Sequence, residues 1–166
     1  MVAVADHAAC VKINGRADFT SSVELKKLIT ELWQRGYNRF TFELCDCVTM
    51  DSTFLGMLAG IALKFIDAGN PQATPLELIN PCPRIVDVLE NLGVAHLFRI
   101  TSGPKQGNGQ FEPLAKCGET RTEIARTCLE AHQTLMEIKP ENVLKFKDVA
   151  QFLAEDLKRL EVSENK

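Results

Sequence analysis

Residues 50–58, with the sequence MDSTFLGML, decide the fold of this chain. The alternation of apolar and polar residues at 39–44 predicts a β-strand, and the apolar run that begins at Thr53 predicts a long helix. Asp51 and Ser52 therefore stand where a strand passes through a short loop into a helix. Aspartate is a favoured N-cap residue, and anions are stabilised at the positive end of the helix dipole. The stretch predicts exposed hydroxyls at a helix N-terminus, where added phosphate charge is tolerated.

The apolar pattern on both sides of this stretch predicts alternating strands and helices. The predicted strands lie at about 2–5, 8–13, 39–44, 74–78 and 97–100, and the first two form a hairpin. The predicted helices lie between them at about 21–36, 53–68 and 80–92, and the helix at 53–68 is the buried one. Strands that alternate with helices imply a largely parallel sheet with right-handed crossovers. The sequence therefore predicts an α/β fold whose initial hairpin adds one antiparallel strand.

Local sequence also predicts how two of the helices are built. Ser21 is expected to cap the first helix, with Glu24 reaching back to complete a capping box. The helix at 53–68 is apolar over most of its circumference and is expected to be largely buried. Gly56 and Gly60 leave a smooth strip on it, which predicts close approach to the sheet.

The chain changes character after residue 101. Glycine, serine and proline within 102–118 predict a flexible linker. Two amphipathic helices separated by Lys139-Pro140 predict a helical hairpin within 119–162, beyond a first domain at 1–101. The apolar stripes of the hairpin need cover. We expect that cover to come from the first domain or from a second copy, which would form a homodimer through these helices.

Composition and charge exclude several classes of function. The net charge of −3 and the pI near 5.7 argue against a nucleic-acid-binding surface, which needs clustered Lys and Arg. The longest apolar stretch, 54–66, is interrupted by Lys64 and is too short to cross a bilayer. The N-terminus has no basic segment followed by an apolar core, so we expect no signal peptide and a cytoplasmic protein.

No metal site, cofactor site or catalytic set is indicated by local sequence. Of six cysteines only Cys45 and Cys47 are close, and no second pair follows, so zinc is not expected. His7, His96 and His132 are scattered, and no Ser-His-Asp or Cys-His set is indicated. The later glycines do not have the spacing of a phosphate-binding loop. The chain is therefore not expected to be an enzyme or to bind a cofactor.

The segment at 50–58 resembles the phosphorylation loop of STAS domains, the anti-sigma factor antagonist family, whose pattern is roughly Asp-Ser-Ser/Thr-x-Leu-Gly. The resemblance covers about 4–101 and includes two weaker matches, GRAD at 15–18 and the segment from Asn80-Pro81 to Leu92-Gly93. It implies a mixed, mainly parallel sheet flanked by helices, with the helical hairpin as an extension. One departure is Phe54, which stands where many relatives carry glycine.

The resemblance implies a regulatory module switched by phosphorylation. In this family a serine kinase that also restrains a sigma factor or another regulator binds the STAS protein and phosphorylates the serine after the aspartate. The complex then weakens, and a metal-dependent serine phosphatase resets it. Here that serine is Ser52, and Thr53 is the second candidate. The alternative is that Asp51-Ser52-Thr53 is simply a good N-cap before an apolar helix.

The resemblance also implies a partner-binding surface around this loop. Its residues are Asp18, Asp51, Ser52, Thr53, Phe54 and Gly56. Asp18 matches the family's partner-contacting acidic residue, and the alternative is a turn or cap residue before the first helix. Two other functions stay open: a STAS scaffold that is not phosphorylated and docks or dimerises through its tail, and a small α/β enzyme.

Overall fold

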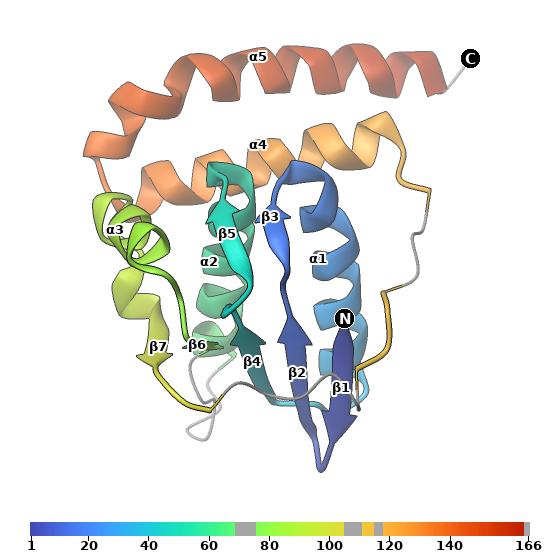
Figure 1. The fold of residues 1–166 in the computed structure, drawn as a ribbon. Coiled ribbons are helices and arrows are strands. Elements are labelled where there is room, and N and C mark those ends of the chain that lie inside the picture. Colours follow the sequence, from blue (N-terminus) through green and yellow to red (C-terminus); the bar gives the residue numbers. More distant parts are fainter. Residues whose placement is uncertain (69–75, 105–110, 115–117, 165–166) are drawn as a thin grey trace.

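A five-stranded mixed sheet lies at the centre of the protein (Figure 1). This computed structural model describes residues 1–68, 76–104, 111–114 and 118–164. In spatial order the strands are β1 (Val2–Ala5), β2 (Ala8–Lys12), β4 (Arg39–Glu43), β6 (Leu76–Ile79) and β7 (Phe98–Thr101). β1 is antiparallel to β2, and the other neighbours pair in parallel. The predicted α/β class and the initial hairpin are confirmed.

Helices make the crossovers between the parallel strands. α1 (Phe19–Gln34) follows β2, α2 (Ser52–Asp67) follows β4, and α3 (Pro83–Asn91) with the short 3-10 helix η1 (Ala95–Leu97) follows β6. The predicted end of the buried helix at 69–71 and the proposed strand residue Thr74 lie outside the described residues. The helices at 21–36, 53–68 and 80–92 were all predicted, with bounds that differ by a few residues.

A separate ribbon of two short parallel strands was not predicted. β3 (Gly15–Ala17) pairs with β5 (Cys47–Met50), so that Ala17 lies opposite Met50. Strands of this length are too short to show a clear alternation in sequence, and their pairing joins segments about 30 residues apart. The ribbon matters because α1 and α2 both begin directly after it.

The hydrophobic core lies between the sheet and the helices packed on it. Its fully buried side chains include Phe42 and Leu78 on the central strands, Ile29 on α1, and Leu55 and Leu58 on α2. Along β4 and β6 buried side chains alternate with half-buried or exposed ones, so the bulky apolar residues gather on the face of the sheet that the helices cover. Burying each such side chain contributes roughly 1.5–3 kcal/mol. The prediction that α2 is largely buried is confirmed.

The N-cap of α1 is Asp18, so the prediction of Ser21 as the cap is wrong. The Asp18 carboxylate accepts hydrogen bonds from the backbone N–H groups of Thr20 and Ser21, each at 3.2 Å. The Ser21 hydroxyl accepts one from the Asp18 N–H at 3.0 Å, which completes a capping box three residues earlier than expected. α1 ends before Gly36, whose φ of +90° favours glycine.

The two C-terminal helices form a hairpin that packs on the rest of the protein. α4 (Arg121–Ile138) lies across α1 and α2, and α5 (Glu141–Glu164) lies along the outer side of α4 (Figure 1). The predicted docked hairpin is thus confirmed, whereas the domain boundaries and the homodimer stay predictions. Parts of the predicted linker, 105–110 and 115–117, lie outside the described residues. Between them, Glu112 forms an antiparallel bridge with Val2.

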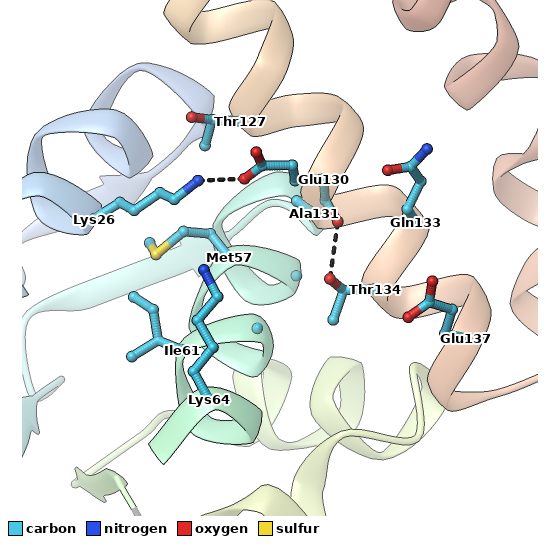
Figure 2. A pocket seen from close by; sticks show the side chains of 12 residues that line it. Lys26, Met57, Ile61, Lys64, Thr127, Glu130, Ala131, Gln133, Thr134 and Glu137 are labelled. Carbon is cyan, nitrogen blue, oxygen red and sulfur yellow. Dashed lines mark hydrogen bonds and ion pairs between the residues drawn. The ribbon is translucent and has the colours of Figure 1, made fainter. Parts of the chain in front are cut away.

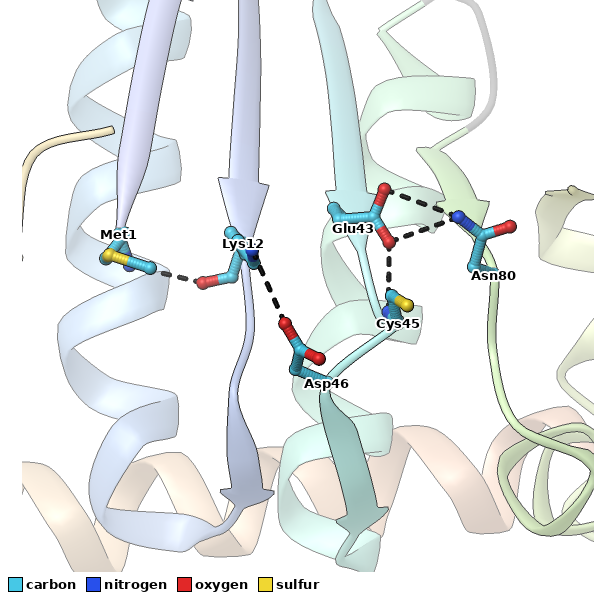
Figure 3. A network of polar contacts seen from close by, with 6 residues as sticks. All are labelled: Met1, Lys12, Glu43, Cys45, Asp46 and Asn80. Carbon is cyan, nitrogen blue, oxygen red and sulfur yellow. Dashed lines mark hydrogen bonds and ion pairs between the residues drawn. The ribbon is translucent and has the colours of Figure 1, made fainter. Parts of the chain in front are cut away.

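Two buried polar side chains at the carboxyl ends of β2 and β4 find their partners in the loops that follow the strands (Figure 3). Lys12 forms an ion pair with Asp46 at 3.4 Å. The fully buried Glu43 accepts a hydrogen bond from the Cys45 N–H at 2.9 Å and from the Asn80 side-chain amide at 3.3 Å. Polar groups this deeply buried are tolerated when they are hydrogen-bonded or paired. The network therefore fixes the loops that follow the central strands.

Asn142 anchors the start of α5, and its replacement tests the hairpin. Its buried amide donates hydrogen bonds to the carbonyls of Leu92 at 2.9 Å and Leu135 at 2.8 Å. Asn142→Ala removes both bonds and leaves the Leu92 carbonyl without this donor, whereas the Leu135 carbonyl still accepts from the Lys139 N–H at 3.3 Å. We therefore expect a loss of about 1–3 kcal/mol in the free energy of unfolding, measured by urea denaturation. Gln151→Ala is the control, because Gln151 is exposed on the same helix. Equal losses in both variants would contradict the anchoring role.

Candidate functional site

The N-termini of α1 and α2 are held side by side by one carboxylate. Asp51 Oδ1 accepts a hydrogen bond from the Phe54 N–H and so caps α2, while Oδ2 accepts one from the Phe19 N–H of α1, both at 2.8 Å. The Asp51 N–H in turn donates to the Ala17 carbonyl at 3.0 Å. Asp18 and Ser52, which were predicted to share one surface, therefore lie at the same end of the molecule.

The Ser52 hydroxyl lies 3.0 Å from Nε2 of His132, a residue of α4. His132 Nδ1 lies 2.7 Å from the Cys128 carbonyl oxygen. Because a carbonyl oxygen can only accept, Nδ1 carries the proton, and in the neutral ring Nε2 accepts from the Ser52 hydroxyl. The ring also packs against Phe146 of α5, with 5.0 Å between the ring centroids. Ser52 is thus bonded to a histidine that is only 6% exposed.

α4 covers the first turns of α2 beyond Ser52. The buried Thr53 hydroxyl is hydrogen-bonded to the Cys128 thiol, and burial raises the pKa of that thiol. A Cβ added to Gly56 would stand 2.9 Å from Ala131 Cβ, and closer still to the Ala131 carbonyl group. The glycine strip therefore faces α4 and not the sheet, so that expectation is wrong.

Three residues of the predicted partner surface are not open in this structure. Thr53 and Phe54 are buried, and Gly56 lies beneath α4. Asp18, Asp51 and Ser52 are half-buried. The structure therefore gathers the six predicted residues at one end of the protein but offers a partner mainly these last three. Their part in binding stays a prediction.

Ion pairs and a hollow border the contact between α2 and α4. Lys26 of α1 pairs with Glu130 of α4, and Lys27 Nζ lies 2.7 Å from Glu123 Oε1. Figure 2 shows Lys26 reaching toward Glu130 at the edge of a hollow of about 210 Å³, which is also lined by Gly60 and Thr134. Exposed ion pairs contribute little stability, so they orient α4 more than they hold it.

His132 is the residue of this site that sequence reasoning missed. Its contact with Ser52 joins residues 80 positions apart, so no local motif contains both. One signal was present: His132 follows the apolar stripe that Cys128, Ala131 and Leu135 form along α4. A polar side chain on a stripe that becomes buried needs a hydrogen-bonding partner.

The Ser52–His132 pair has the reach of a nucleophile and a general base, but its surroundings are not those of a catalytic triad. The hydroxyl meets the buried ring directly. The ring is oriented by a carbonyl oxygen and not by a carboxylate. Within the described ranges, no three His, Cys, Asp or Glu side chains are placed to hold a metal ion. Among the helices that the structure describes, none has the length and apolar character to span a membrane.

The carboxylate of Asp18 is stabilised in its charged form. The Thr20 hydroxyl donates a hydrogen bond to it at 2.6 Å, and this bond, with those from the backbone N–H groups of Thr20 and Ser21, lowers the pKa of Asp18 below its ordinary value of 3.8. The residue implied to contact a partner is therefore also a structural cap.

Substitutions at Asp18 separate its charge from its capping role. Asp18→Ala removes the cap, so we expect a loss of about 1 kcal/mol in the free energy of unfolding. Asp18→Asn keeps a capping oxygen and should retain most of that stability. Because the folded pKa is lowered, the charge stabilises the fold above pH 3.8 and this contribution disappears as the pH falls through the folded value. In urea denaturation between pH 2 and pH 6, the free energy of unfolding of the wild type should fall at the acid end as Asp18 becomes protonated, and Asp18→Asn should lack this fall.

Comparison with known proteins gives a family and a fold. A family model described as the STAS domain matches residues 1–106, so α4 and α5 lie beyond the match. A search among curated proteins found no match.

Among solved structures, the crystal structure of TM1081 from Thermotoga maritima, a candidate anti-sigma factor antagonist, has a TM-score of 0.53 at 20% identity and covers 61% of this chain and 84% of that one. The anti-sigma factor antagonist SpoIIAA in its unphosphorylated form has a TM-score of 0.52 at 15% identity, with coverage of 60% and 85%. At these identities the likeness shows the fold.

Proposed function

Because the chain belongs to the STAS domain family, we propose that it is a regulatory binding module of the anti-sigma factor antagonist kind, switched by phosphorylation of Ser52. STAS domains are typically regulatory modules and not enzymes. The observation that carries the proposal is the position of Ser52 at the first residue of the capped helix α2, at the same end of the molecule as Asp18.

The surroundings of Ser52 favour it over Thr53 as the phosphate acceptor. Thr53 is buried and its hydroxyl is bonded to Cys128, whereas Ser52 is half-buried at the helix end. The free N–H groups of the first helical turn stabilise an anion there. Phosphate adds about −1.5 to −2 charge beside Asp51, which would repel a partner that had accepted a neutral hydroxyl.

The partner in this proposal is a serine kinase that acts as an anti-sigma factor, and a metal-dependent serine phosphatase restores the hydroxyl. The likeness to SpoIIAA, an anti-sigma factor antagonist described in its unphosphorylated form, supports this partner class. The binding surface consists of Asp18, Asp51 and Ser52 at the paired ends of α1 and α2, together with the nearby backbone.

A STAS scaffold that is not phosphorylated is the second candidate. The observation that favours it is the docked hairpin, because α4 engages the Ser52 hydroxyl and covers the next turn of α2. In that case the Ser52–His132 bond would simply hold the tail in place. The two functions differ in whether Ser52 ever carries phosphate.

Phosphorylation of the full chain distinguishes the two candidates. After incubation with ATP and the anti-sigma-type serine kinases of the same genome, we expect intact-mass spectra to show one phosphate that maps to Ser52. Ser52→Ala should lose the phosphate and keep kinase binding, whereas Ser52→Asp should weaken binding by supplying part of the charge. Thr49→Ala is the control, since it removes a neighbouring hydroxyl before Asp51. A single phosphate mapped outside residues 51–53 would refute the assignment.

The role of Asp18 in binding needs a variant that keeps its cap. Asp18→Lys would remove the cap together with the charge, so it cannot separate partner binding from stability. Asp18→Asn removes only the charge, and we expect it to weaken kinase association while the melting temperature stays close to that of the wild type. Unchanged affinity, measured by calorimetry, would remove Asp18 from the surface.

A further inference from the structure

We propose that α4 is a built-in competitor for the partner: it occupies the Ser52 face of α2 in the closed protein, and phosphate on Ser52 displaces it. This inference rests on the proposed function and extends it to regulation of the same site. α4 lies outside the residues matched by the STAS family model, so the competitor is supplied by this chain's own extension.

The closed state is defined by a direct contact between backbones. The space that a Cβ on Gly56 would need is already filled by the carbonyl group and Cβ of Ala131. At this distance α4 leaves no layer in which a second protein could lie. One turn farther along α2 the helices separate: a Cβ on Gly60 would stand 3.6 Å from Thr134 Oγ1, at the hollow in Figure 2. The contact is therefore tightest next to the switch residue.

A phosphate on Ser52 is incompatible with the hydrogen bond that joins Ser52 to His132 of α4. The 3.0 Å between the Ser52 hydroxyl and His132 Nε2 is a hydrogen-bond distance and holds no further atoms. His132 cannot retreat without breaking its bond to the Cys128 carbonyl and moving Phe146 of α5. The phosphate would also add charge next to Asp51. The phosphate is therefore accommodated when α4 moves away from Ser52 as a unit.

The same contact restricts the unmodified protein. A kinase that must hold the Ser52 hydroxyl in its active site cannot do so while that hydroxyl is bonded to the buried His132 of α4. Ser52 is then phosphorylated from the open state, and the phosphate prevents α4 from closing again. Docking of α4 and engagement of the Ser52 face by a partner are mutually exclusive.

The reactivity of Cys128 reports on this opening in the full chain. Cys128 is buried on α4 against α2, bonded to Thr53, whereas Cys45 is exposed and Cys47 is buried in the core. N-ethylmaleimide labelling followed by peptide mass spectrometry gives one rate for each thiol. Cys45 serves as the reactive reference, and Cys47 stays slow as long as the core is folded.

Gly56→Ala and Gly60→Ala form a matched pair, because both add one methyl group to the same face of α2. Gly56→Ala must displace α4, so we expect Cys128 labelling to rise by about tenfold or more, in line with the usual cost of overpacking. Gly60→Ala has room and should stay within about twofold of the wild type, as expected for a change that overpacks nothing. Equal rates in the two variants would overturn the closed contact, and fast labelling of Cys47 would mark an unfolded variant.

Phosphoserine installed at position 52 during translation tests the switch without any kinase. We expect Cys128 labelling to rise as in Gly56→Ala. A rate equal to or below that of the wild type would overturn the proposal and show that α4 tolerates or binds the phosphate.

In the kinase assay, Gly56→Ala should be phosphorylated faster than Gly60→Ala, and equal rates would overturn the competition while leaving Ser52 as the acceptor. Release of α4 by phosphoserine, with no kinase acting on any variant, would instead count against the proposed function.

Discussion

The side chain of Asp51 determines where the N-termini of α1 and α2 meet. Each of its carboxylate oxygens accepts from the first turn of a different helix, α1 through Phe19 and α2 through Phe54. The neighbouring backbone bond from Asp51 to Ala17 continues the β3–β5 ribbon up to that point. Two helix N-termini that would otherwise diverge are thus fixed side by side, with their positive dipole ends together. The same bonds set the direction in which the Ser52 hydroxyl points.

This arrangement leaves one face of α2 that the sheet does not cover. α2 is apolar on nearly all sides, so a second layer is needed to remove that face from water. α4 provides it, and Gly56 lets the two backbones meet at Ala131. The Ser52–His132 bond lies at the edge of this packed surface. The half-buried Ser52 is therefore coupled to an apolar contact, and a charge placed on it would act on the whole contact.

The sequence predicted the parts of the fold whose periodicity is strong. Strand β4 and helix α2 were placed correctly because their patterns are long and regular, and Ser52 followed from them. The capping residue of α1 was misplaced because Ser21 and Glu24 also form a plausible capping box in sequence, whereas in the structure the Asp18 carboxylate accepts from the N–H groups of Thr20 and Ser21. His132 could not be predicted as part of the site, because its role exists only once α4 has docked on α2.

In the proposed closed state, a partner must displace α4 of the same chain before it can bind the Ser52 face. A tethered helix competes at an effective concentration that for short flexible links reaches about the millimolar range, well above that of most free proteins. If α4 covers the Ser52 face in about 99% of molecules, the apparent affinity of a partner falls about a hundredfold below its intrinsic value. The exposed pairs Lys26–Glu130 and Lys27–Glu123 add little to the closed state, whereas Gly56, Ala131 and the buried Asn142 hold it. In the proposed switch, the strength of α4 docking, and not only the chemistry of Ser52, therefore sets the threshold at which the module responds.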